Sequence, residues 1–288
     1  MASLKDLRRR IRATKSMQQI FKAMEMVAAA KLRRAQQRAQ SASPYAAKIS
    51  AMLANLSGAA AELEHPLFKV REVRTTALVL ITADRGFAGA YNTAILRVAE
   101  QRLKSAPRGS IQCVVVGRKG RDYLRRRGYP VMAAHTDLPG EASLDLARRI
   151  TNDLTERFIA GEVDRVEILY THFVNAIVRR VLTATFLPIG TGIGSGDATS
   201  SAAGSAIFEP NAESIFAELL PRYATAMLYA SMADALASEH SARMVAMGSA
   251  RKNAGELVDS LTLTRNRMRQ AAITREISEL VGGAEALN

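Results

Sequence analysis

The longest stretch of the chain without proline is residues 222–288, which read RYATAMLYASMADALASEHSARMVAMGSARKNAGELVDSLTLTRNRMRQAAITREISELVGGAEALN. Only Gly248 and Gly255 interrupt the interior of this run. With the residues just before it, the pattern predicts one helix over 212–284, which would extend roughly 100 Å. A compact domain of this chain length is only about 40–50 Å across. Such a helix cannot be buried within its own domain and must protrude.

The other end of the chain predicts a second long helix, over residues 3–43. Its apolar or small residues recur every three or four positions, as in a heptad seam, with Gln18 and Glu25 in two of the slots. Beyond Pro44 the pattern resumes to about Leu56, so this helix is expected to kink and continue. The two long helices predict an antiparallel coiled coil of the chain ends. A helical bundle with broken helices is the alternative.

The middle of the chain predicts an inserted α/β domain, because apolar strand runs alternate there with helical patterns. The expected strands are residues 73–82, 111–117, 166–171 and 177–185, and the expected helices are residues 90–105, 118–127 and 143–160. The composition then turns to Gly, Ser, Ala and Thr, which is typical of a flexible loop near residues 190–206. The predicted organisation is an N-terminal coiled-coil helix over 1–57, a Rossmann-like α/β domain over 58–207 and a C-terminal coiled-coil helix over 208–288.

Composition excludes several classes of protein. The chain has 288 residues, is 48% hydrophobic and has a single cysteine, which rules out an intramolecular disulfide framework. No window holds eighteen consecutive apolar residues, so no membrane span is expected. The start, MASLKDLRRR, lacks the apolar stretch of a secretory signal, which favours a cytoplasmic location.

Few residues carry the patterns of catalysis or of cofactor binding. A turn over Asp84–Asn92 follows a predicted strand and opens a helix, but its glycines have a GxxG spacing that fits a tight turn better than a phosphate site. Cys113 lies within an aliphatic strand and is expected to be an inert core thiol. The four histidines lie in four different segments, so no metal site is predicted. We therefore expect no catalytic site, no cofactor and no metal.

The strongest signal is positive charge on the terminal helices. The net charge is +13. Residues 1–40 hold eleven basic and two acidic residues, and residues 243–275 hold seven basic and two acidic ones. A solvated helix face is the plain interpretation, but two basic helices in one hairpin repel each other. An acidic partner around the hairpin would offset that repulsion.

The C-terminal stretch ITRE at 273–276, followed by Glu279 and by GAEA at 283–286, fits a family signature with its spacing intact. With it, the chain resembles the gamma subunits of F-type ATP synthases along nearly its whole length. Residues 238–254 (SEHSARMVAMGSARKNA) and 22–31 (KAMEMVAAAK) are also similar to the family. The turn that begins with Asp84-Arg85-Gly86 occupies the place of a family motif as well.

The resemblance implies a central-stalk rotor that couples proton flow through the membrane sector to ATP synthesis or hydrolysis. The coiled coil would be a shaft inside a ring of three alpha and three beta subunits. The α/β domain would sit on the c-subunit ring and the epsilon subunit, at the cytoplasmic face of a bacterial plasma membrane. The subunit would regulate ATPase activity and proton flow without a catalytic site of its own.

By the same resemblance, seven residues are expected to contact partners. Arg269, Gln270 and Thr274 would lie against a beta subunit. Met24 and Arg243 would pair across the coiled coil near an acidic beta loop. The contacts toward the c ring and epsilon would be made by Lys31 and Phe208.

Two other classes of function are open from the residues alone. A basic coiled-coil nucleic-acid-binding protein would bind duplex DNA with a steep dependence on salt. A nucleotide-binding α/β enzyme using the Asp84–Asn92 turn would bind a mononucleotide saturably, although no phosphate motif supports it.

Overall fold

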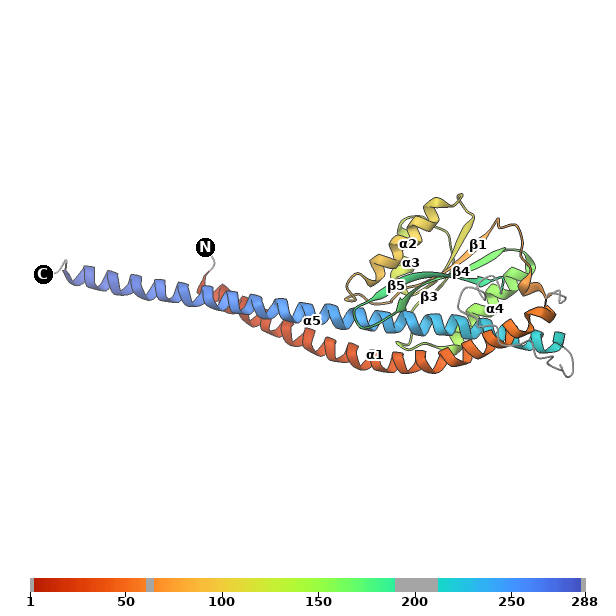
Figure 1. Cartoon of the computed structure of the whole chain (residues 1–288). Helices are drawn as coiled ribbons and strands as arrows, with labels where there is room; N and C mark the ends of the chain where they lie inside the picture. The colour runs from red at the N-terminus through yellow and green to blue at the C-terminus, as the bar shows by residue number, and fades with distance from the viewer. Residues whose placement is uncertain (1–2, 61–64, 190–211, 286–288) are drawn as a thin grey trace. The chain divides into compact units, whose positions relative to one another are not determined.

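A computed structural model describes residues 3–60, 65–189 and 212–285. It contains two long helices, α1 (Leu4–Ala60) and α5 (Ala212–Glu285), with an α/β region between them in the sequence (Figure 1). The chain divides into two compact units, one of Met1–Ala28 with Met244–Asn288 and one of Ala29–Arg243. The predicted segments 1–57, 58–207 and 208–288 follow the order of the chain, whereas each compact unit combines parts of more than one segment. The division into these three segments therefore stays a prediction.

The second unit is built on a five-stranded sheet with the order β3-β2-β1-β4-β5. Parallel ladders join β1 to β2, β1 to β4 and β2 to β3, and only the pair β4·β5 is antiparallel. The sheet is therefore mainly parallel, as predicted. The strands are β1 (Thr76–Ile81), β2 (Ile111–Val116), β3 (Val131–His135), β4 (Arg165–Phe173) and β5 (Arg179–Leu187).

Helices cover both faces of this sheet, which is why β1 is buried along its whole length. Side chains alternate along the strand, so Leu78 and Leu80 pack with α2 (Tyr91–Ser105) and α3 (Arg118–Arg126). The opposite face packs against α4 (Leu144–Ala160) and against the first part of α5. A short 3-10 helix, η1 (Pro66–Phe68), adds the buried side chain of Leu67 to the core on this opposite face of the sheet.

Local sequence sets the ends of these elements. Helix α4 begins where the Ser143 hydroxyl accepts a hydrogen bond from the Leu146 N–H, and it ends at Gly161, which has a left-handed φ of 79°. Strand β5 runs to Leu187, two residues past the predicted end. The predicted flexible loop near 190–206 lies outside the described residues.

The first unit pairs the start of α1 with the end of α5. The predicted seam residues Leu7, Ile11, Thr14 and Ala28 are buried on α1, and Ala254 and Val258 are buried on α5. The helices are antiparallel, because the predicted polar seam residues Gln18 and Glu25 lie against Gly255 and Gly248, respectively. The predicted coiled coil is thus confirmed, and α1 continues through Pro44 to Ala60.

The glycines create the space that these two polar side chains occupy. A Cβ added at Gly255 would come 2.9 Å from Gln18 Nε2, and one added at Gly248 would come 3.2 Å from Glu25 Oε1. Glu25 is also held by an ion pair with Arg251, with 2.8 Å between Oε2 and Nε. Two polar residues seven positions apart therefore fit two glycines seven positions apart on the facing helix.

Candidate partner-contact surfaces

Cys113 belongs to the core between the sheet and helices α2 and α3. Cys113 is fully buried, and burial raises the pKa of its thiol to about 12, so at neutral pH it is not a nucleophile. Within residues 3–60, 65–189 and 212–285, no group of three or more His, Cys, Asp or Glu side chains could hold a metal ion.

In the Asp84–Asn92 turn, side-chain oxygens accept hydrogen bonds from backbone N–H groups that follow neighbouring strands. The Asp84 carboxylate accepts hydrogen bonds from the N–H groups of Arg118, at 2.7 Å, and Leu138, at 2.6 Å, which follow β2 and β3. Asn92 Oδ1 accepts one from the Ala83 N–H at 3.0 Å. The interpretation as a tight structural turn fits these contacts, because the Asp84 carboxylate and the Asn92 amide oxygen are already bonded to the backbone of neighbouring segments.

Helix α5 fills the crevice where open α/β sheets commonly bind ligands. That crevice lies at the carboxyl ends of β1 and β4, where the strand order reverses. The Tyr91 hydroxyl donates to the carbonyl of Ala235 at 3.1 Å, and Ser238 Oγ donates to the carbonyl of Thr171 at 2.9 Å. The space left beside them is only about 30 Å³, which is room for a water molecule. The sheet therefore holds a helix of its own chain at this position.

Arg243 belongs to a partly buried charge cluster at the same crevice. Its Nη2 lies 2.5 Å from Glu239 Oε1, and its guanidinium donates to the Gly86 carbonyl at 3.3 and 3.4 Å. The two charged side chains are only 14% and 12% exposed. Burial raises the pKa of Glu239, although Arg243 opposes that shift. The cluster therefore fixes α5 to the turn that follows β1.

His240 and Lys31 belong to the same neighbourhood. Burial, together with the nearby charges of Arg243 and Lys31, lowers the pKa of His240 to about 4. The imidazole is therefore neutral at pH 7, while Lys31 is exposed. The structure thus brings two of the predicted contact residues, Lys31 and Arg243, into one electrostatic cluster, and their assignment to partners stays a prediction.

The other predicted contact residues lie on the helices of the first unit. Met24 is half-buried, whereas Arg269, Gln270 and Thr274 are exposed on α5. The Thr274 hydroxyl donates to the Gln270 carbonyl at 3.0 Å, within the helix. Phe208 lies outside the described residues.

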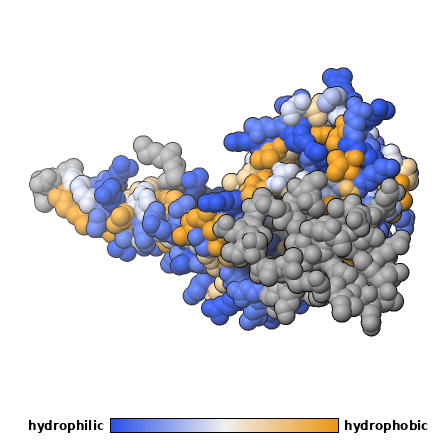
Figure 2. Space-filling view, turned by 45° about the vertical axis from the view of Figure 1, so that its right-hand side comes forward, coloured by the Kyte–Doolittle hydropathy of each residue, from blue (hydrophilic) through white to orange (hydrophobic). Residues whose placement is uncertain are grey.

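Among the described residues, none of α1 lies opposite the last turns of α5. Since Gln18 faces Gly255 and Glu25 faces Gly248, the start of α1 at Leu4 falls opposite about Arg269. Beyond that point the apolar residues of α5 are all well exposed, namely Ile273, Ile277, Leu280 and Val281. Their spacing places them on one side of the helix. Apolar and hydrophilic residues are interspersed along the helices in Figure 2.

Positive charge is poorly neutralised on the same unit. The basic side chains from Lys5 to Lys22 on α1 are all exposed. Among the described residues of this stretch, one ion pair forms, between Arg9 and Asp6 at 3.3 Å. Exposed apolar side chains next to an exposed basic surface are typical of a helix that contacts another protein. No helix in the described ranges is long and apolar enough to cross a membrane.

Comparison with known proteins gives matches over the full chain. A family model described as ATP synthase matches residues 3–287. A relative named ATP synthase gamma chain from Desulforamulus reducens is 47% identical over 290 residues and covers 100% of both chains. The same name belongs to relatives from Moorella thermoacetica, 45% identical with 100% of both chains covered, and Symbiobacterium thermophilum, 46% identical with 98% of both covered.

Solved structures show a similar fold. A chain of the Euglena gracilis mitochondrial ATP synthase, in an OSCP/F1/c-ring structure, gives a TM-score of 0.68 at 19% identity, covering 99% of this chain and 94% of that one. A chain of the Tetrahymena thermophila enzyme, in a central stalk and c-ring structure, gives 0.64 at 24% identity, covering 80% and 99%.

Proposed function

The chain belongs to the ATP synthase gamma chain family, and from that premise we propose that it is the central-stalk rotor subunit of an F-type ATP synthase. It couples proton flow through the membrane sector to the synthesis or hydrolysis of ATP. It has no catalytic site of its own and regulates the ATPase activity of the subunits around it. The relatives described above do not support the alternative of a nucleic-acid-binding protein.

One observation of the structure carries this proposal: α5 continues past the start of α1 with an exposed apolar side. An isolated helix of this kind is poorly stabilised, because most helical stability comes from packing of the apolar side. A surrounding ring of three alpha and three beta subunits supplies that packing. Arg269, Gln270 and Thr274 lie where the unpartnered part of α5 begins, which supports their proposed contact with a beta subunit.

The paired helices suit the transmission of torque. Small seam residues such as Ala28 and Ala254, and the glycines at 248 and 255, let the two helices pack closely. Such a pair resists bending better than either helix alone. As the shaft turns, different sides of it contact each beta subunit in turn. A rotor can drive a catalytic site only if its contacts with the different conformational states of that site differ in free energy.

The remaining contacts follow from charge and from the family. The exposed basic side chains of α1 attract acidic surfaces of the surrounding subunits over several ångströms. Lys31 and Phe208 are proposed to lie toward the c-subunit ring and the epsilon subunit, and Met24 and Arg243 near an acidic beta loop. The subunit would thus be peripheral, at the cytoplasmic face of a bacterial plasma membrane.

Reconstitution tests the role directly. The chain is mixed with alpha and beta subunits of the same source, and the product is analysed by native mass spectrometry and by an ATPase assay. We expect one copy per three alpha and three beta subunits, with ATPase activity that depends on its presence. Failure to join the ring, combined with strongly salt-dependent binding to duplex DNA, would instead favour the nucleic-acid function.

The proposed beta contact is tested by replacing Arg269 and Gln270 with Ala in one variant. Because both side chains are exposed, the fold should be unchanged, while assembly or the coupling of hydrolysis to proton pumping should weaken. The matched control is Arg97→Ala, which removes one exposed positive charge from α2. Unchanged ATP synthesis in membranes carrying the double variant would count against this contact.

A further inference from the structure

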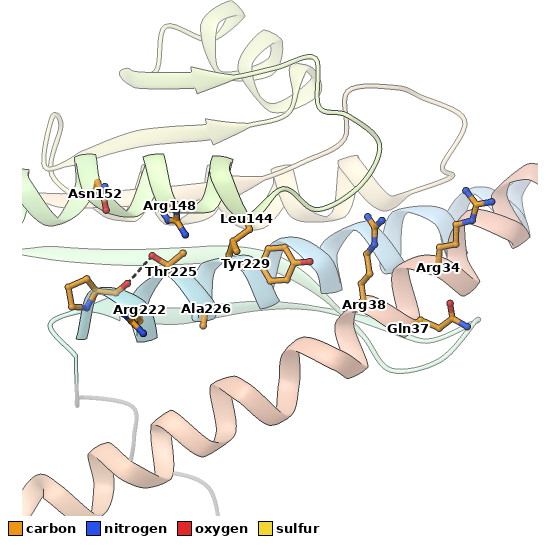
Figure 3. Close-up of a pocket in the computed structure, with 11 residues that line it drawn as sticks. Arg34, Gln37, Arg38, Leu144, Arg148, Asn152, Arg222, Thr225, Ala226 and Tyr229 are labelled. Carbon is orange, nitrogen blue, oxygen red and sulfur yellow. Dashed lines mark hydrogen bonds between the residues drawn. The ribbon is translucent and has the colours of Figure 1, made fainter. Parts of the chain in front are cut away.

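A cavity of about 860 Å³ lies between α1, α4 and α5 in the second unit, apart from the crevice and the charge cluster described above. Figure 3 shows that three helices contribute its lining, with Arg34 and Arg38 on α1, Arg148 on α4 and Arg222 on α5. All of these residues belong to the unit of Ala29–Arg243. A volume of this size is typical of pockets that bind small organic molecules.

The charge of the lining is one-sided. Four arginines line the cavity, and none of its described lining residues is acidic. Arg38 is paired with Glu141 and Arg222 with Glu218, each with 2.5 Å between nitrogen and oxygen. Over the part of the chain that the structure describes, neither Arg34 nor Arg148 has a carboxylate within ion-pair distance. Among the described residues, two cations of the lining therefore lack a counter-charge, Arg148 near Leu144 and Arg34 at the other end of the lining (Figure 3).

The rest of the lining combines apolar side chains with the polar groups of Gln37, Asn152 and Thr225. Leu144, Ala226 and Tyr229 contribute hydrocarbon and aromatic surface beside the guanidinium groups. Leu144 is 47% exposed although it is a leucine, whereas Ala226 is buried at the cavity wall. Positive charge along a concave wall of low polarity concentrates the electrostatic potential and attracts anions more strongly than the same charge on a flat surface.

This combination defines the chemistry of a ligand. Arginine binds phosphate through paired, charge-assisted hydrogen bonds, and its planar group suits this geometry better than a lysine ammonium does. Spaced cations favour a molecule with more than one anionic oxygen. The apolar wall favours a ligand with an organic body as well as its phosphate.

We propose that this cavity binds a phosphate-bearing organic anion, with its phosphate at Arg148 and its organic part against Leu144, Ala226 and Tyr229. Two sources supply this chemistry, namely a nucleotide and the headgroup of an acidic phospholipid. The site is independent of the rotor role, since it requires only the second unit of the fold.

Isothermal titration calorimetry on the full chain tests the site. The probes are ATP, ADP, pyrophosphate and short-chain dihexanoyl phosphatidylglycerol below its micelle concentration. Saturable binding of ATP or ADP identifies a nucleotide source, and saturable binding of the phosphatidylglycerol identifies a lipid source. Either result supports the proposal, whereas the absence of saturable binding for all four probes overturns it.

Variants separate a built site from general attraction to a basic protein. Arg148→Gln should raise the Kd at least tenfold, because it removes a charge-assisted contact to the phosphate. Arg34→Gln should raise the Kd less, because it removes a positive charge farther along the same lining. Arg125→Gln is the matched control, since Arg125 is exposed on α3 and does not line the cavity. Its Kd should stay within twofold of the original.

Circular dichroism establishes that the control and both cavity variants are folded before their Kd values are compared. Equal weakening in the control and in both cavity variants would mean non-specific attraction and would overturn the site. Using two cavity variants on different helices keeps the test decisive if one of them folds poorly. Ring assembly is measured separately, so failure here is distinguishable from failure of the rotor proposal.

Discussion

Acid should destabilise this protein through His240, and the replacement His240→Gln should remove most of that effect. The imidazole is only 3% exposed, and its Nδ1 lies 3.4 Å from Arg243 Nη1. Burial is the main reason why its pKa falls from 6.5 to about 4, and the charges of Arg243 and Lys31 lower it further. A glutamine of similar size can still accept a hydrogen bond from Arg243, but it does not titrate.

The sign follows from the lowered pKa. In the unfolded chain His240 takes up a proton below pH 6.5, whereas in the folded chain it stays neutral until about pH 4. The contribution of His240 to the free energy of unfolding is therefore complete above pH 6.5, and it is lost as the pH decreases toward 4. At 1.36 kcal/mol per pKa unit, the loss between pH 7 and pH 5 is about 2 kcal/mol. Glu239 acts in the opposite direction, because its raised pKa lets the folded chain take up a proton first.

Comparison of the two proteins isolates the histidine, since the contribution of Glu239 is common to both. Urea unfolding is followed by far-ultraviolet circular dichroism at pH 7 and pH 5. We expect the original chain to lose about 2 kcal/mol more than the glutamine variant between these two pH values. Equal losses in the two proteins would contradict this expectation, because they would show that the pKa of His240 is the same in the folded and the unfolded chain.

Three further changes have defined outcomes. Gly255→Ala should stabilise the first unit by about 0.5–1 kcal/mol, because alanine favours the helix and the nearest atom is the flexible end of Gln18; a fall in Tm would contradict this. Gly117→Ala should destabilise by about 3 kcal/mol or more, since φ is 103° and the new Cβ would lie 2.2 Å from the Thr82 carbonyl oxygen; urea unfolding or a loss of soluble protein measures it, and near-original stability would argue against that geometry. Cys113 should react with a thiol reagent at pH 8 only after urea is added, because burial raises its pKa to about 12; rapid reaction of the folded chain would show that the strand opens.

The elements with strong periodicity were predictable from the sequence. The heptad seam gave the antiparallel helices, and the aliphatic runs gave β1, β2, β4 and β5. Strand β3 (Val131–His135) was missed, because its residues are all half-buried at the edge of the sheet and include two alanines and a histidine. Such a strand owes its existence to pairing with β2 rather than to its own composition.

The candidate site was less predictable, because it depends on which distant segments meet. Nothing local to Glu239 or Arg243 indicates that α5 fills the crevice at the ends of β1 and β4. One signal was nevertheless present: Gln18 and Glu25 are separated by seven residues, and so are Gly248 and Gly255. Equal spacing of polar seam residues on one helix and glycines on the other indicates that they pack together.

Those two matched contacts also govern how the helices respond to a pull along their length. With a single glycine opposite a single polar side chain, sliding by seven residues would preserve the heptad pattern at little loss. With two, the same slide makes either Gln18 or Glu25 move aside for a residue that has a Cβ, and it breaks the ion pair between Glu25 and Arg251. A flexible Gln18 can move aside at little cost, so it is chiefly the Glu25–Arg251 ion pair, together with the Glu25–Gly248 contact, that favours the present alignment and opposes sliding of the two helices along their length.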